Sequence, residues 1–191
     1  QSPDEPITLA LRIPGWAGEP VLTVNGSVVP VDVERGFARV RRTWRAGDTV
    51  GLRLRVEPAL VRADVAVADA AGKVAVMRGP VVYCVEGIDN EVPIHQLRLD
   101  PTGELTTGDD TWAGLPVVRA TGVAERNPER NPERNRERNT EPNTEPNTGH
   151  ADGLYRRSSP VADPTTITAV PYFAWDNRGS STMAVWLRAD G

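Results

Sequence analysis

The chain has 191 residues, of which 39% are hydrophobic, 25% charged and 5% aromatic, and its formal net charge is -4. This length suits one large or two small domains, each with a modest core. The acidic balance provides no basic field for phosphate, which argues against nucleic acid and anionic membranes as partners. The single cysteine, Cys84, excludes an intramolecular disulfide. It favours the cytoplasm and leaves secretion open.

The N-terminus begins at Gln1, directly before a strand-like segment, so we expect the first domain to be N-terminally truncated. Residues 8–13 alternate between apolar and other side chains, the period of a half-buried strand, and Pro14 and Gly15 end that segment. Residues 22–24 and 28–31 flank Asn25 and Gly26, the pair best suited to a type I′ hairpin turn.

Further strand patterns follow along the chain. Residues 37–44 form a less regular strand pattern, and residues 50–56 alternate most clearly of all. Two apolar runs, 72–77 and 81–85, are separated by a bend that contains Pro80. No segment has the spacing of an amphipathic helix, and the alanine-rich residues 62–71 could form one or two turns at most.

These patterns predict an all-β protein of two small antiparallel β-sandwich domains, residues 1–86 and 87–191. Within the second domain, residues 125–148 repeat a tetrapeptide six times, from Glu-Arg-Asn-Pro to Glu-Pro-Asn-Thr. The repeat has no large apolar residue with which to offset the entropy of ordering, so residues 125–150 are predicted to be a disordered insertion. Residues 167–175 and 183–188 then resume the strand pattern and are expected to pair with strands before the insertion.

Several motifs, in this order, resemble the region that follows the catalytic barrel in glycoside hydrolase family 127. They are LRIPGW at 11–16, VNG at 24–26, RTW at 42–44 with Gly47-Asp48, RGPVVYCVEG at 78–87 with Asp89-Asn90, PYFAW at 171–175 with Asn177-Arg178-Gly179, and MAVW at 183–186. The repeat departs from the family pattern and leaves the loop geometry of the second domain open.

The resemblance implies a parent enzyme that hydrolyses non-reducing-end β-L-arabinofuranosides with retention. It also implies a helical barrel, outside this chain, in which a nucleophilic cysteine, further cysteines and a glutamate surround zinc. One cysteine cannot supply such a site, so no cofactor is expected in this chain. Cys84 lies in an apolar run and is interpreted as an inert, buried thiol.

Other catalytic arrangements are also missing from the sequence. His95 and His150 lie far apart and outside any ligand motif. Glu86 and Asp89 are the most conspicuous acidic pair, but Asp89-Asn90 is also what a turn after a strand requires. No residue is therefore assigned a catalytic or metal-binding role, and the chain alone is not expected to be an enzyme.

The five tryptophans support either a sugar-binding or a packing interpretation. Trp44 and Trp186 are expected in the core, whereas Trp16, Trp112 and Trp175 are the candidates for contacts with a neighbouring domain or with sugar. The favoured function is a non-catalytic scaffold that supports a catalytic barrel of the same protein, with a homodimer left open. The alternative is a free-standing carbohydrate-binding module.

Overall fold

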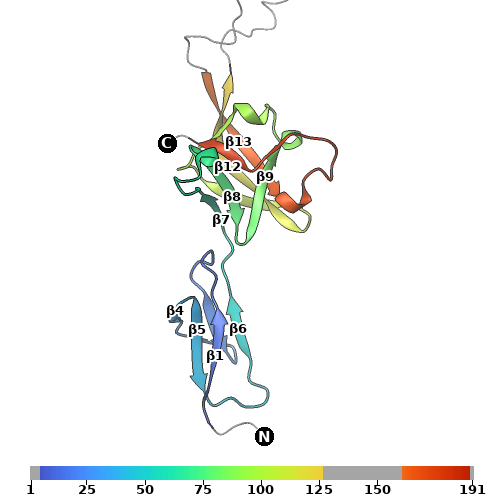
Figure 1. The fold of residues 1–191 in the computed structure, drawn as a ribbon. Coiled ribbons are helices and arrows are strands. Elements are labelled where there is room, and N and C mark those ends of the chain that lie inside the picture. The colour runs from blue at the N-terminus through green and yellow to red at the C-terminus, as the bar shows by residue number, and fades with distance from the viewer. Residues whose placement is uncertain (1–4, 127–160, 190–191) are drawn as a thin grey trace, which may run out of the picture.

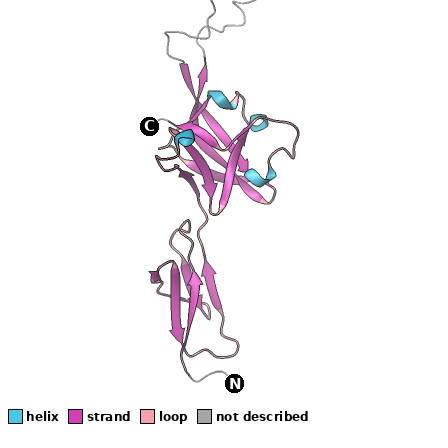
Figure 2. Ribbon diagram, in the orientation of Figure 1, coloured by secondary structure: helices cyan, strands magenta, loops and turns pink. Residues whose placement is uncertain are grey.

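The computed structural model describes residues 5–126 and 161–189, which form two all-β domains joined end to end by one short connection (Figure 1). Strands dominate both domains, and the helices among the described residues are single 3-10 turns (Figure 2). None of these helices is long and apolar enough to cross a membrane. The all-β fold class predicted from the sequence is confirmed.

The first domain consists of two three-stranded sheets. One contains β1 (Ile7–Arg12), β5 (Phe37–Arg42) and β4 (Val33–Glu34), and the other contains β3 (Ser27–Val29), β2 (Val21–Val24) and β6 (Val50–Arg53). Asn25 and Gly26 turn the chain between β2 and β3 with positive φ angles of 51° and 79°, as the sequence predicted. Asn25 also bonds across the domain to Asp48 and to the backbone N–H of Thr49.

The core of the first domain is small. Among its described residues, four hydrophobic ones are buried: Ile13, Leu22, Val24 and Ala38. Leu9 and Ile7 share the inward face of β1 with Leu11, which pairs with Ala38, yet they are 37% and 48% exposed. The two sheets therefore leave one end of this sandwich uncovered.

The second domain contains the remaining strands, and their pairing closes into a circuit in the order β8, β9, β13, β12, β10 and β15, then back to β8. The bounds are β7 (Pro58–Val61), β8 (Lys73–Arg78), β9 (Val81–Glu86), β10 (Leu97–Leu99), β11 (Leu105–Trp112), β12 (Leu115–Arg126), β13 (Val161–Pro171), β14 (Met183–Ala184) and β15 (Trp186–Ala189). Closure leaves few unpaired strand edges. All pairings are antiparallel except that of β10 with β15, which is parallel.

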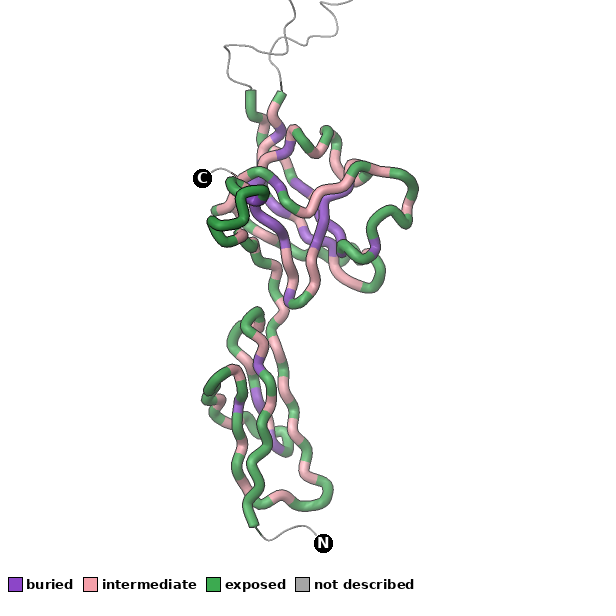
Figure 3. Tube along the Cα trace, viewed as in Figure 1, coloured by how far each residue is buried: buried purple, intermediate pink, exposed green. Residues whose placement is uncertain are grey.

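The inward faces of this circuit form the main core of the molecule (Figure 3). Val74, Leu97, Val118 and Ile167 are at most 2% exposed. Tyr83 is 1% exposed, and its hydroxyl donates to the carbonyl of Pro116 at 2.8 Å, which satisfies the one polar group of this side chain. The first domain has a much smaller buried core.

Two expected boundaries differ from the structure. The domains meet near residue 57, not between residues 86 and 87, because β7, β8 and β9 pair within the second domain. The expected insertion begins too early, because Glu125 and Arg126 belong to β12 and pair with Ala162 and Val161 of β13. The rest of the expected insertion, residues 127–150, lies outside the described residues.

Candidate functional site

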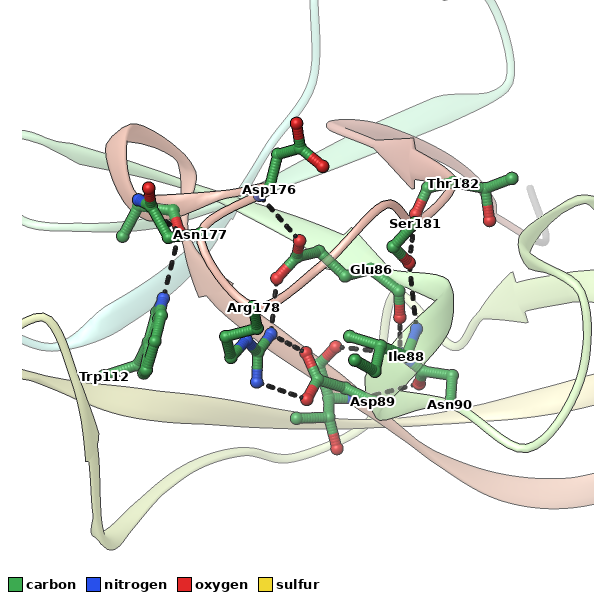
Figure 4. A network of polar contacts seen from close by, with 12 residues as sticks. Glu86, Ile88, Asp89, Asn90, Trp112, Asp176, Asn177, Arg178, Ser181 and Thr182 are labelled. Carbon is green, nitrogen blue, oxygen red and sulfur yellow. Dashed lines mark hydrogen bonds and ion pairs between the residues drawn. The ribbon is translucent and has the colours of Figure 1, made fainter.

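A buried acidic residue of the second domain, Glu86, forms an ion pair with Arg178. Glu86, the last residue of β9, is 1% exposed, and Asp89 lies in the following 3-10 turn, η2 (Gly87–Asp89). Arg178 reaches both from the loop after η4 (Tyr172–Ala174): Nη2 donates to each carboxylate, and Nη1 donates to Asp89 Oδ1 at 2.7 Å (Figure 4). One guanidinium therefore serves two carboxylates, and we call Glu86, Asp89 and Arg178 the arginine clasp.

Backbone groups complete the arginine clasp. The N–H of Asp176, which has a φ of 61°, donates to Glu86 Oε1 at 3.0 Å (Figure 4). Asn90 then ties the same turn to β13, since its amide donates to Thr168 O at 3.2 Å and accepts from Thr168 N–H at 3.1 Å. The bonds from Asp176 N–H and Arg178 offset the cost of removing the Glu86 carboxylate from water.

Trp112 lies beneath the guanidinium. The Cζ atom of Arg178 is 4.7 Å from the centroid of the Trp112 ring, the geometry of a cation–π contact. Trp112 Nε1 donates to Ala174 O at 3.1 Å. Both the ring face and the donor of Trp112 are therefore engaged within the protein.

The arginine clasp is a network of ion pairs and lacks the arrangement needed for proton transfer to a substrate. Hydrogen bonds to Asp89 and then to Glu86 raise the pKa of Arg178 further above its usual value, although partial burial opposes this. A glycosidase pair needs one acid that can donate its proton and a second carboxylate with access to the sugar. Glu86 is occluded and both carboxylates are bound by Arg178, so the clasp lacks that arrangement.

Cys84 precedes the arginine clasp on β9 but cannot act as an accessible thiolate. The residue is 1% exposed, and burial, followed by the charge of Glu86, raises the pKa of its thiol to about 11. No group of three histidine, cysteine or acidic side chains with metal-binding geometry occurs among the residues that the structure describes. The residues of this chain therefore do not fit the zinc site that the family resemblance implies for the barrel.

The structure does not bring the three candidate tryptophans together. Trp16 lies against the domain connection, where its ring is 3.5 Å from the position that a Cβ on Gly79 would occupy. Trp112 lies under Arg178, and Trp175 is 36% exposed beside η4. Their proposed contacts with a neighbouring domain or with sugar stay predictions.

The expectation that Trp44 and Trp186 are core residues is wrong. Trp44 is only half-buried at the edge of the first domain, where it donates to Ile7 O at 3.0 Å and stacks with Arg42. Trp186 is 38% exposed, because its neighbour Leu187 takes the inward position on β15. Alternation along a strand places successive side chains on opposite faces.

Comparison with protein-family models matches both domains. The glycoside hydrolase family 127 C-terminal domain matches residues 58–188, and the β-L-arabinofuranosidase GH127 middle domain matches residues 1–56. The chain belongs to glycoside hydrolase family 127. The division between the two matches also coincides with the domain connection at residue 57.

Known family 127 proteins are similar along almost the whole chain. A non-reducing end β-L-arabinofuranosidase of Bifidobacterium longum subsp. longum is 34% identical over 97% of this chain and 26% of its own length. A solved GH127 β-L-arabinofuranosidase of Geobacillus stearothermophilus T6 is also 34% identical, with a TM-score of 0.75, over 99% of this chain and 28% of its own. A further GH127 β-arabinofuranosidase structure is 27% identical with a TM-score of 0.69. The chain thus spans about a quarter of the length of these relatives and covers their middle and C-terminal domains.

Proposed function

We propose that this chain is a non-catalytic scaffold that supports the catalytic barrel of a β-L-arabinofuranosidase-like protein. The observation that carries the proposal is the match of the chain to the middle and C-terminal domains of family 127, together with its span of about a quarter of the relatives. The parent would hydrolyse non-reducing-end β-L-arabinofuranosides with retention, and its zinc would be bound by the barrel rather than by this chain.

The connection between the domains supports a scaffold of fixed shape. Gly79, in the turn between β8 and β9, is buried, and a Cβ built on it would lie 2.8 Å from Val56 Cγ1 and 3.5 Å from the Trp16 ring. Gly18 also donates its N–H to the carbonyl of Arg55 at 3.4 Å. Close packing at the connection limits rotation of one domain against the other, as a support for a third domain requires.

The open end of the first domain supports a further protein contact. Ile7 and Leu9 are on the inward face of β1 but stay 48% and 37% exposed. Covering apolar side chains of this size stabilises a complex by about 25 cal/mol per Å² of buried area. In the proposed parent, chain that belongs to the barrel or to its connection would cover them.

The proposal is tested by mixing the purified chain with the barrel of the Geobacillus relative, expressed without its own β domains. We expect a stoichiometric complex in size-exclusion chromatography and a gain in soluble yield or in aryl-arabinofuranoside hydrolysis by the barrel. An Ile7→Ser/Leu9→Ser variant should weaken the complex, whereas Val28→Ser, at an exposed apolar position in the other sheet of the domain, should not. A fully active barrel that ignores the chain would refute the scaffold function.

The activity of the isolated chain provides the second half of the test. No arabinose or aryl product should be released, with or without zinc and reductant, because the chain has a single cysteine and its thiol is buried. Zinc-dependent turnover that disappears in Cys84→Ser would contradict the proposal.

A further inference from the structure

A pocket of about 740 Å³ lies beside strands β14 and β15, where the segment around His95 lines it together with Lys73, Trp186 and Arg188. Pockets that hold small ligands typically measure about 300–1,000 Å³, so this one has room for a sugar unit. The arginine clasp does not contribute to it. The proposed scaffold function does not use these residues.

Trp186 is the one aromatic residue in the lining of this pocket. It is 38% exposed, and its partner across the strand pair is Ala75, a side chain too small to cover an indole ring. Within the described part of the chain, Trp44 and Trp112 donate their Nε1–H to carbonyl groups, but the Nε1–H of Trp186 has no such partner. Trp186 therefore keeps both a ring face and a donor for a ligand.

Positive charge collects at the same pocket. Lys73 and Arg188 are opposite each other in the β8–β15 register, although like charges at such positions repel. Lys73 Nζ donates to the neutral carbonyl of Asp69 at 2.9 Å, and no carboxylate among the described residues pairs with it. The lining has two cationic side chains, Lys73 and Arg188, and no acidic one, in a chain whose formal net charge is -4.

Arg188 is held in place for a ligand contact. Its Nη2 donates to Glu125 at 2.6 Å and to His95 O at 2.9 Å, and no other described residue bonds to its Nε or Nη1. A guanidinium fixed through one nitrogen loses little side-chain entropy when it binds an anion through the others. The pocket therefore combines an aromatic platform with a preorganised cation and an ammonium group that lacks a carboxylate partner.

We propose that this pocket binds a sugar ring that carries a carboxylate, that is, a uronate unit of an acidic glycan. The ring stacks on Trp186, and its carboxylate accepts hydrogen bonds from Lys73 and Arg188. A phosphate or carboxylate without a ring would leave the indole unused, and a neutral sugar would leave the Lys73 ammonium without a carboxylate partner. A second pocket, of about 630 Å³, is lined by Asp89 and Glu91 and by no aromatic residue, so it lacks both features. The proposal does not depend on the scaffold function.

The test follows the five indole N–H signals of the whole chain by NMR during addition of sodium D-glucuronate. D-Glucose, which has the same ring but no carboxylate, is the neutral control. The signal that Trp186→Phe removes belongs to Trp186. We expect the Trp186 signal to shift as glucuronate is added and to saturate with a dissociation constant on the order of millimolar, as is usual for one small sugar. Glucose should bind at least about tenfold more weakly. Raising the salt concentration should weaken the glucuronate response, since the cations are partly exposed.

Variants separate the pocket from nonspecific effects. Lys73→Met should weaken glucuronate binding about tenfold and Lys73→Arg should keep most of it. Trp186→Ala has no indole signal at this position, so its titration is followed through the backbone N–H of Arg188, and it should lose binding. Trp175→Ala is the matched control, because Trp175 is 36% exposed but lies outside the pocket, and it should bind glucuronate normally. Equal responses to glucose and glucuronate, or unchanged binding by Trp186→Ala in a folded protein, would overturn the proposal. So would the absence of any shift with glucuronate and with tri-galacturonate.

Discussion

Arg178 and Glu86 are 92 residues apart in the sequence, yet the guanidinium of Arg178 donates to a carboxylate that is 1% exposed. The bond joins the loop after η4 to the end of β9, and Asp89 and Trp112 hold the same guanidinium from two further segments. The buried Glu86 carboxylate therefore has its cation only when the loop after η4 is in place.

Replacing Arg178 with alanine should therefore strongly destabilise the second domain. The change leaves Glu86 buried without its cation, which typically costs about 3–5 kcal/mol. The free energy of unfolding, measured by urea denaturation with fluorescence detection, should fall by that order. Arg178→Ala/Glu86→Gln should recover part of the loss, because no buried charge is then left unpaired.

Arg119→Ala is the control for this prediction. Arg119 also pairs with an aspartate, Asp110, but the two side chains are 38% and 66% exposed. Exposed ion pairs contribute about 0–1 kcal/mol, so this variant should unfold nearly as the parent chain does. Equal losses for Arg178→Ala and Arg119→Ala would show that the arginine clasp does not stabilise the fold.

Gly79→Ala should destabilise the domain connection beyond the ordinary cost of alanine at a positive φ. Gly79 has a φ of 58°, and its new methyl group would lie 2.8 Å from Val56 Cγ1. Gly72→Ala is the matched control, because Gly72 has a φ of 67° but a methyl group added there would meet nothing within 4 Å. We expect Gly79→Ala to cost about 1–3 kcal/mol more than Gly72→Ala, the range seen for overpacked sites.

A second substitution, Val56→Ala, tests whether contact with Val56 causes the destabilisation expected for Gly79→Ala. Removing the two methyl groups of Val56 should relieve much of the clash, so Gly79→Ala/Val56→Ala should be more stable than the sum of the single variants predicts. Small-angle X-ray scattering should also report a broader distribution of interdomain distances for Gly79→Ala than for Gly72→Ala. Additive losses and identical scattering would exclude the contact as the cause.

Cys84 should be unreactive in the folded protein and should make stability depend on alkaline pH. Its thiol pKa is raised to about 11, mainly by burial, so only about one molecule in a thousand carries a thiolate at pH 8. Modification by a thiol reagent should be at least about 100-fold faster in denaturant. A slow reaction that becomes fast only on unfolding is the expected result, and rapid modification of the native protein would contradict it.

The sign of the pH effect follows from the same shift. The folded thiol keeps its proton above the pKa at which the unfolded thiol loses its own, so the stabilising contribution is complete below about pH 9 and is lost as the pH rises towards 11. The difference in unfolding free energy between the parent chain and Cys84→Ala should shrink over this interval by about 2 kcal/mol. Because Tyr83 also titrates at alkaline pH, with its pKa raised by burial, the difference between the two proteins isolates the cysteine.

Local signals in the sequence were sufficient to predict strands and turns. The Asn25-Gly26 hairpin and the alternating strand of the first domain were both read from short segments. The domain boundary was not, because residues 50–56 alternate without interruption towards the connection and β8 and β9 look no different from strands of the first domain. Only pairing between distant strands, such as β9 with β13, assigns them to the second domain.

The pairing of Arg178 with Glu86 was also beyond sequence reasoning. The sequence predicts a turn at Asp89-Asn90, but nothing local joins residues 92 positions apart. The outward position of Trp186, by contrast, is predictable from the sequence. Leu187 is the natural inward residue of that strand, so alternation places Trp186 and Arg188 together on the outer face, an aromatic ring beside a cation.

The last prediction concerns the segment between β12 and β13. Arg126 and Val161 are register partners, so the ends of this segment are adjacent and a two-residue Asn-Gly turn in place of residues 127–160 can close the hairpin. The sequence predicts no core in residues 127–150, and a shorter loop costs less entropy to close. The melting temperature of the shortened protein should therefore be equal to or a few degrees above that of the unshortened chain.

Glu125 must be kept, because its carboxylate binds both Arg98 and Arg188 and is 15% exposed. Starting the deletion at residue 125 instead should lower the melting temperature and, if Glu125 positions Arg188, weaken glucuronate binding as well. A cooperative loss of structure when only residues 127–160 are replaced would show that the repeat segment contributes to the folded domain.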